Sequence, residues 1–273
     1  MTDLIDDASD VQLAPYRLVG DPRALEREGL FVAEGRLVVE RVFEDGRFAI
    51  HSVLVTAAAA SAMSGVFAAR PDVPVHVCDP AILQRVTGFN FHRGCVALAC
   101  RPRPEDEPSA LLLRAARILA LEGVTDPDNV GGLFRTALAF GVDAVMLDRA
   151  TADPLYRKAI RTSVAATLRV PFVRVDSWTD ALRTLRDEGL RVIALTPHPD
   201  AMALEDVVTG ADDRLVIVAG SEGFGMSRDS LALADARVRI PIDPRADSLN
   251  VVTAVAIALH ALRNRVTATF LRE

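Results

Sequence analysis

The sequence predicts two α/β domains, the second built on a mostly parallel β-sheet that helices cover on both faces. Two observations support this fold class. Short apolar runs of strand length alternate with helical patterns along the chain. Residues 101–109 interrupt the alternation with three prolines and mixed charge, as a linker does. With 273 residues, 50% of them hydrophobic, the chain can form two hydrophobic cores.

The first domain is expected over residues 13–100, as a small α/β module. Its expected strands include Val53–Val55 and Val73–Val77. A helix is expected at Gly35–Phe43, because the apolar residues there fall on one side. Residues 1–12 are acidic and carry no basic side chain, so they are expected to be disordered.

The second domain is expected over residues 110–273, after the linker at 101–109. Helical patterns separate its apolar runs, and this order is typical of a parallel sheet. The expected strands are Ile118–Leu121, Ala144–Leu147, Arg191–Leu195, Leu215–Ala219 and Val238–Ile240.

Charge and cysteine content exclude several classes of protein. The net charge is −6, and most of the acidic excess precedes Ser109. Polar residues interrupt the longest uncharged stretch, Phe48–Ala69, which argues against a membrane span. The acidic N-terminus is unlike a secretory signal, so a cytoplasmic protein is expected. The three cysteines form no CxxC pair, which argues against a disulfide framework and a structural metal.

The segment 121–148 carries a strand end, a polar loop and a helix beginning near Asn129, with Asp128 or Asn129 as its cap. Arg135 points away from the apolar face of this helix, and Gly131 and Gly132 lie on its side. Glycine lowers helix propensity, so this pair indicates that something approaches the backbone closely. The alternative is a surface arginine above a tightly packed turn.

The segment 215–231 carries an apolar strand that runs into a glycine loop with Gly220, Gly223 and Gly225. Ligands bind at the carboxyl ends of strands in open α/β sheets. The GxxGxG order matches neither a dinucleotide fold nor a phosphate loop, so a tight structural turn is the alternative. Glu222 in the middle of the loop could meet a cationic or hydroxyl-bearing group.

The segment 237–262 carries a short strand that stops at Pro241, followed by a loop and a helix that opens at Ser248 to Asn250. The helix is apolar nearly all round from Val251 to Leu259, which predicts burial against the sheet or a second subunit. Its first polar residues act either as caps alone or as part of a site.

Taken together, "NVGGLFRTALAFG", "GSEGFGMS" and "IPIDPRADSLNVVTAVAIALHAL" resemble the three signature motifs of the SpoU, or TrmH, family of RNA ribose methyltransferases in the SPOUT superfamily. The motifs occur in the family's order, from Leu112 to the C-terminus. Tyr156–Ala166 is similar to the family's intermediate segment, and the N-terminal part is similar to an RNA-binding extension. The resemblance implies a C-terminal SPOUT domain with a trefoil knot, preceded by a small α/β RNA-binding domain.

The resemblance also implies S-adenosylmethionine as cofactor. No metal is needed, because the sulfonium itself supplies the electrophilic methyl group. The family's cofactor contacts correspond to Leu195, Thr196, Gly220, Gly225, Ile240 and Leu249.

The implied reaction is methylation of a ribose 2′-hydroxyl, which must be held in line and lose its proton. The resemblance assigns this work to Arg135, paired with an RNA phosphate, as a base or as an orienting group. The residues that position Arg135, the ribose and the cofactor correspond to Asn129, Glu222, Ser248 and Asn250. The implied partners are RNA and a second copy of the chain, as a homodimer. The large N-terminal extension favours ribosomal RNA over tRNA.

Two other classes of protein compete with this interpretation. A non-catalytic RNA-binding relative would be expected to have lost Arg135, Asn250 or the glycine loop, and all three are present. A dinucleotide-dependent enzyme is disfavoured by the order of the glycines and by their late position in the chain.

Overall fold

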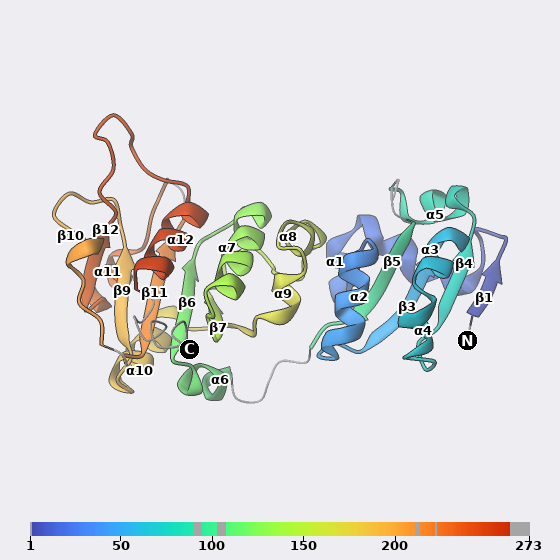
Figure 1. The fold of residues 1–273 in the computed structure, drawn as a ribbon, viewed down its shortest axis with the longest axis horizontal. Helices are drawn as coiled ribbons and strands as arrows, with labels where there is room; N and C mark the ends of the chain where they lie inside the picture. Colours follow the sequence, from blue (N-terminus) through green and yellow to red (C-terminus); the bar gives the residue numbers. More distant parts are fainter. Residues whose placement is uncertain (1, 90–93, 103–107, 211–212, 222, 263–273) are drawn as a thin grey trace, which may run out of the picture. The chain divides into compact units, whose positions relative to one another are not determined.

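The computed structural model describes residues 2–89, 94–102, 108–210, 213–221 and 223–262 (Figure 1). The chain divides into two compact units. Unit 1 comprises Met1–Pro104 and Pro154–Arg169, and unit 2 comprises Glu105–Asp153 and Val170–Glu273. Within the described ranges, none of the helices combines the length and apolar character that a membrane span requires.

Unit 1 contains a mixed five-stranded sheet (Figure 1). In spatial order its strands are β1 (Thr2–Ile5), β4 (Val75–Cys78), β3 (Ile50–Val55), β5 (Cys95–Cys100) and β2 (Leu30–Glu34). The β4 strand pairs in parallel with β1 and β3, whereas β5 runs antiparallel to β2 and β3. The helices of this unit are η1 (Val11–Gly20), α1 (Pro22–Arg27), α2 (Arg36–Asp45), α3 (Ala57–Ala62), α4 (Ser64–Ala68), α5 (Pro80–Thr87), α8 (Arg157–Thr162) and α9 (Ala166–Arg169).

The N-terminal residues differ from the predicted disorder over 1–12. Thr2–Ile5 form β1, which pairs with β4, and Ile5 is only 4% exposed. Ile5 packs in one core cluster with Leu13 and Tyr16 of η1. The acidic composition hid this strand, because one inward-facing apolar side chain is enough to attach a short edge strand to the sheet.

Two of the three free cysteines lie in the core of unit 1. Burial raises the pKa of the Cys78 thiol to about 11 and that of Cys95 to about 12, so both are protonated at neutral pH. Protonated thiols are poor nucleophiles. These two residues therefore act as small apolar side chains, and Cys100 is half-buried.

The segment Pro154–Arg169 belongs to unit 1, whereas the sequence places it in the second domain. Arg157 forms an ion pair of 3.1 Å with Glu34, and Arg41 Nη1 donates to the carbonyl of Val164 over 2.7 Å. Val164 and Ala165 have φ angles of 53° and 66°, a region that non-glycine residues rarely adopt. These tertiary contacts link residues far apart in the chain, so a motif pattern cannot reveal them.

Unit 2 contains a seven-stranded sheet whose strands are all parallel. In spatial order they are β10 (Met202–Ala203), β12 (Ala236–Arg239), β9 (Arg191–Leu195), β11 (Leu215–Gly220), β6 (Arg117–Glu122), β7 (Ala144–Leu147) and β8 (Phe172–Arg174). The five strands expected from the sequence are present, and the parallel sheet is confirmed. The trefoil knot stays a prediction of the resemblance.

Helices cover both faces of this sheet (Figure 1). They are α6 (Pro108–Arg114), α7 (Pro127–Ala139), α10 (Trp178–Asp187), α11 (Arg228–Leu233) and α12 (Val251–Ala261), with the short η2 (Leu204–Asp206). Successive strand residues face opposite sides. Ile118 and Ala120 pack with Leu182 of α10, whereas Leu215 and Ile217 approach Leu259 of α12.

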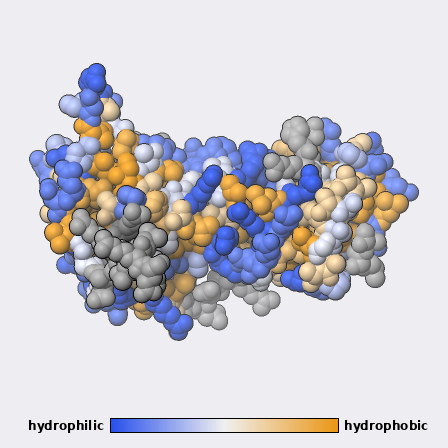
Figure 2. Space-filling model, viewed as in Figure 1, coloured by the Kyte–Doolittle hydropathy of each residue, from blue (hydrophilic) through white to orange (hydrophobic). Residues whose placement is uncertain are grey.

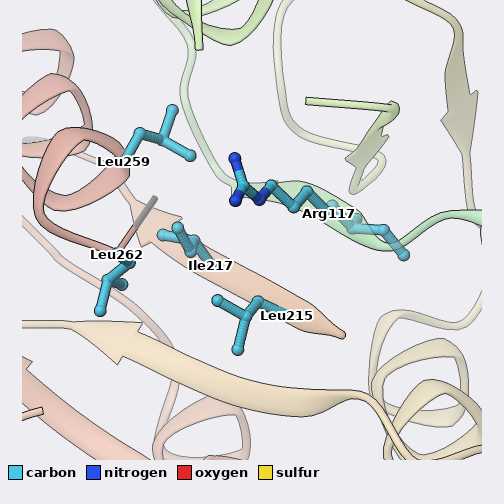
Figure 3. A pocket seen from close by; sticks show the side chains of 6 residues that line it. Arg117, Leu215, Ile217, Leu259 and Leu262 are labelled. Atoms are coloured by element: carbon cyan, nitrogen blue, oxygen red, sulfur yellow. The ribbon is translucent and has the colours of Figure 1, made fainter. Parts of the chain in front are cut away.

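A gap of about 10 Å³ lies beneath α12, lined by Arg117, Ile217 and Leu259 among others (Figure 3). Figure 3 shows the side chain of Arg117 extending along the strand towards Leu259. The volume holds at most about one water molecule. This gap is therefore a packing feature and not a ligand site.

Candidate active site

A pocket of about 640 Å³ opens at the carboxyl ends of β9, β11 and β12. This volume lies within the range of roughly 300–1,000 Å³ typical of small-molecule sites. Its walls come from the segments that follow these three neighbouring strands. Among the lining residues are Leu195, Thr196, Gly220, Phe224, Gly225, Ile240, Ser248, Leu249 and Val255.

The structure brings together all six residues that the resemblance assigns to the cofactor. They are Leu195, Thr196, Gly220, Gly225, Ile240 and Leu249, and each lines the pocket. Thr196 continues the pairing of β9 with β12, because its amide donates to the carbonyl of Val238 over 2.9 Å. The six come from three segments of the chain, so the pocket is a product of the sheet topology.

The glycine loop after β11 is folded tightly upon itself. A Cβ atom on Gly220 would lie 2.4 Å from the carbonyl carbon of Gly225, so no larger residue fits there. The amide of Gly225 donates to the carbonyl of Ser221 over 3.0 Å. Gly223 and Gly225 have φ angles of 93° and 66°, which favour glycine. Both alternatives for this loop therefore hold: it is a tight turn, and it forms a wall of the pocket.

The first turns of α7 and α12 are joined by their asparagines. Asn250 Nδ2 donates to Asn129 Oδ1 over 3.0 Å. Asn250 also caps α12, because its Oδ1 accepts from the amide of Val252 over 2.9 Å. A Cβ atom on Gly132 would lie 2.8 Å from Val252 Cγ2, so α12 accounts for the close approach expected at the paired glycines.

The cap of α7 differs from the sequence-based prediction. Asp126 is the N-cap and accepts from the amide of Asp128 over 2.9 Å, whereas Asp128 or Asn129 was expected. Pro127 explains the shift, because its fixed φ and missing amide hydrogen suit the first helical position. Asn129 thus lies inside the first turn, where its side chain is available to Asn250.

Arg135 has an exposed side chain on α7, and it does not line the pocket. Within the described ranges, its guanidinium has no hydrogen bond or ion pair to another side chain. An uncompensated arginine is suited to binding a phosphate from solution. Ser248 does line the pocket, two residues before Asn250. Glu222 lies outside the described residues.

Two features of the site are not evident from the sequence motifs alone. Glu122, at the end of β6, accepts a hydrogen bond from the amide of Ser227 over 3.3 Å and thereby ties β6 to the segment after the glycine loop. Phe224 lines the pocket although it is 97% exposed. The sequence offers a signal for each residue. Glu122 is an acid at a strand end, and Phe224 is an aromatic residue between two glycines.

The loop between β12 and α12 projects beyond the sheet (Figure 1), and its tip is hydrophilic (Figure 2). Asp243 and Arg245, both in this loop, form an exposed ion pair of 2.9 Å. Across the residues that the structure describes, no cluster of three or more His, Cys, Asp or Glu side chains is arranged to hold a metal ion.

The parallel sheet, the pocket at the carboxyl ends of its strands and the glycine loop define an α/β protein that binds a small ligand in its strand-end loops. The sequence model of the SpoU rRNA methylase family matches residues 116–260, which span most of unit 2 and the segment inserted into unit 1. The chain belongs to this family and is a methyltransferase of the SpoU type.

Related proteins agree with this assignment. An uncharacterized tRNA/rRNA methyltransferase of Mycobacterium bovis is 37% identical over 266 residues, which cover 93% of this chain and 89% of the relative. A solved RNA 2′-O ribose methyltransferase is 25% identical with a TM-score of 0.75, covering 96% of this chain and 99% of that one. An AdoMet-bound rRNA methyltransferase of Sinorhizobium meliloti has the same fold, with a TM-score of 0.80, 21% identity and coverage of 96% and 97%.

Proposed function

We propose that this chain transfers a methyl group from S-adenosylmethionine to a ribose 2′-hydroxyl of RNA, with ribosomal RNA preferred over tRNA. One observation carries the proposal. The six residues that the family resemblance assigns to the cofactor line a single pocket, in a chain that belongs to the SpoU family. The similarity to a solved RNA 2′-O ribose methyltransferase supports the ribose hydroxyl as the acceptor.

The residues of the pocket fit S-adenosylmethionine. Gly220 lacks a Cβ atom at the point where Gly225 packs against it, so the loop can close tightly while both glycines line the pocket. Ile240 and Leu249 provide apolar surface suited to an adenine ring. When bound, the cofactor supplies an electrophilic methyl group on a sulfonium.

Arg135 binds the RNA phosphate next to the target ribose and orients the 2′-hydroxyl. A guanidinium stays protonated at neutral pH and can donate two parallel hydrogen bonds to a phosphate. Asn129 and Asn250 hold the first turns of α7 and α12 together, and Arg135 lies further along α7. Ser248, at the pocket wall, is placed to hydrogen-bond the ribose or the cofactor. Their common effect is to fix the hydroxyl relative to the methyl group.

A homodimer is part of the proposal. The α12 helix is apolar along most of its length, yet Ile257 is 39% exposed and Ala256 is half-buried. A second copy could cover this face. Light scattering is expected to give about twice the 29.4 kDa mass of the chain. A species of 29.4 kDa alone would contradict the dimer.

The decisive experiment is transfer of labelled methyl from S-adenosylmethionine to RNA from a strain that lacks the gene. A 2′-O-methyl group removes the hydroxyl that attacks the phosphodiester in alkali. Label in alkali-stable dinucleotides is therefore expected, and label in mononucleotides would indicate base methylation instead. Fractionation of the labelled RNA distinguishes ribosomal RNA from tRNA. No transfer with intact cofactor binding would favour a non-catalytic relative.

The role of Arg135 is tested with Arg135→Ala and Arg135→Lys in the same assay. Loss of the bidentate contact is expected to lower the transfer rate at least 100-fold in the alanine variant, in line with the effects of removing a transition-state contact. Lysine keeps the charge and is expected to restore part of the rate. Arg183→Ala, an exposed arginine of α10 paired with Asp180, serves as the matched control. Activity of Arg135→Ala within a few-fold of wild type would overturn the assignment.

A further inference from the structure

Phe224 is the most exposed of the large apolar side chains described, at 97%. It lies in the glycine loop and borders the pocket at the ends of β9, β11 and β12. Other strongly exposed apolar residues, such as Val208 at 81%, do not line this pocket. Phe224 therefore combines full exposure with a position beside the proposed reaction site.

The backbone, and not side-chain packing, fixes this position. Gly223 and Gly225 on either side have φ angles of 93° and 66°. The loop closes through the hydrogen bond from the Gly225 amide to the Ser221 carbonyl, and Gly220 packs directly against Gly225. These glycine-dependent conformations hold the ring at the tip of a tight turn. An aromatic residue held in solvent by its backbone is well suited to meeting a partner there.

The exposed ring suits a flat, apolar partner that approaches from solvent, because Phe224 is 97% exposed at the border of the pocket. RNA presents unstacked bases with flat faces, and proteins bind such bases by stacking them on aromatic side chains. Stacking tolerates different bases, because every base has a π-face.

We infer that Phe224 is a substrate-contacting residue, which stacks on the base of the nucleotide being methylated or on its direct neighbour. The inference rests on the proposed function, since it assumes an RNA substrate. Stacking at the pocket mouth would hold the nucleotide while Arg135 binds its phosphate. The ring and the guanidinium then restrain the RNA at two places next to the target ribose.

The test compares Phe224→Ala, Phe224→Leu and Phe224→Trp, with Val208→Ala as a control for loss of an exposed apolar side chain. The RNA is unmethylated ribosomal RNA from the strain that lacks the gene. Phe224→Ala is expected to weaken RNA binding roughly tenfold, in line with the loss of one base–aromatic contact. Tryptophan is expected to restore binding, leucine only in part, and the control is expected to match wild type.

The salt dependence separates stacking from charge. An uncharged ring releases no counterions, so Phe224→Ala is expected to leave the slope of log K against log salt unchanged. Arg135→Ala is expected to make that slope less steep, because it removes a phosphate contact. A changed slope in Phe224→Ala would contradict stacking.

Three other results would overturn the inference. Unchanged RNA binding in Phe224→Ala would show that Phe224 does not contact the RNA. A loss of S-adenosylmethionine affinity equal to the loss of RNA affinity would assign the ring to the cofactor. A change in the mass measured by light scattering would assign it to contact with a second copy. Binding of RNA requires no methyl transfer, so these results stand even if the wild-type protein transfers no methyl group and the proposed function fails.

Discussion

Asn250 Nδ2 donates a hydrogen bond to Asn129 Oδ1 over 3.0 Å, which joins the first turns of α12 and α7. The same amide group caps its own helix, because Asn250 Oδ1 accepts from the Val252 amide. The Asn250 side chain thus links the two helices through Nδ2 and caps α12 through Oδ1. A change at Asn250 can remove either task or both, and this separates helix capping from the link between the helices.

Asn250→Asp is expected to lower methyl transfer about tenfold while changing the free energy of unfolding by less than about 1 kcal/mol. Aspartate keeps the acceptor that caps α12 but cannot donate to Asn129. Asn129→Asp is the matched control, because it retains an acceptor for Asn250 and should keep activity within a few-fold. Chemical denaturation and the transfer assay measure both effects. Wild-type activity in Asn250→Asp would mean that the link is dispensable.

Gly220→Ala is expected to abolish measurable binding of S-adenosylmethionine by calorimetry. The new methyl group would lie 2.4 Å from the Gly225 carbonyl carbon and would force the loop open. Gly223→Ala is the comparison: no atom lies within 4 Å of the place that its Cβ would take, but its φ of 93° disfavours alanine. Gly223→Ala is expected to weaken the binding of S-adenosylmethionine less than Gly220→Ala does. Equal losses in the two variants would mean that backbone strain, and not the steric clash, dominates.

Gly132→Ala is expected to destabilise unit 2 by about 1–3 kcal/mol, the usual cost of overpacking. The added methyl group would lie 2.8 Å from Val252 Cγ2 and would push α12 away from α7. Val252→Ala removes the clashing atoms, so the double variant should recover much of the loss. Thermal unfolding of the single and double variants measures the coupling. Purely additive effects would show that the two positions do not interact.

Val164→Gly is expected to stabilise the protein by about 0.5–1 kcal/mol. A β-branched residue at a φ of 53° is strained by about 1–3 kcal/mol, and glycine relieves this strain at an entropic cost of about 0.5–1 kcal/mol. Val11→Gly, at an exposed position of unit 1 without a positive φ, should instead destabilise. Denaturant titrations compare the two. A destabilised Val164→Gly variant would show that packing of the valine outweighs its strain.

The sheet of unit 2 could be predicted because its central strands are buried on both faces and therefore appear as uninterrupted apolar runs, such as Leu215–Ala219. The β8 and β10 strands were missed, because three and two residues are too few to form a pattern. The β1 strand was missed because acidic charge outweighed a single buried isoleucine. The placement of Pro154–Arg169 with unit 1 depends on ion pairs and carbonyl contacts that no local pattern encodes.

The resemblance to the SpoU motifs supplied the residues that line the pocket, and physical reasoning from spacing alone did not. A glycine loop indicates a close approach, yet only the structure identifies what approaches: Gly225 at Gly220, and Val252 at Gly132. The link between Asn129 and Asn250 joins two motifs 121 residues apart. Phe224 was overlooked, because exposure is a property of the folded loop and not of its composition.

The order in which the strands of the unit 2 sheet are synthesised affects the nascent chain. The ribosome releases β6 with β7 soon after it, but the partner on the other side of β6 is β11, which follows only at Leu215–Gly220. One edge of β6 therefore stays unpaired until β11 has been synthesised. Unpaired strand edges promote aggregation. The residues that line the ligand pocket extend to Val255, so the pocket is complete only once synthesis has passed that residue.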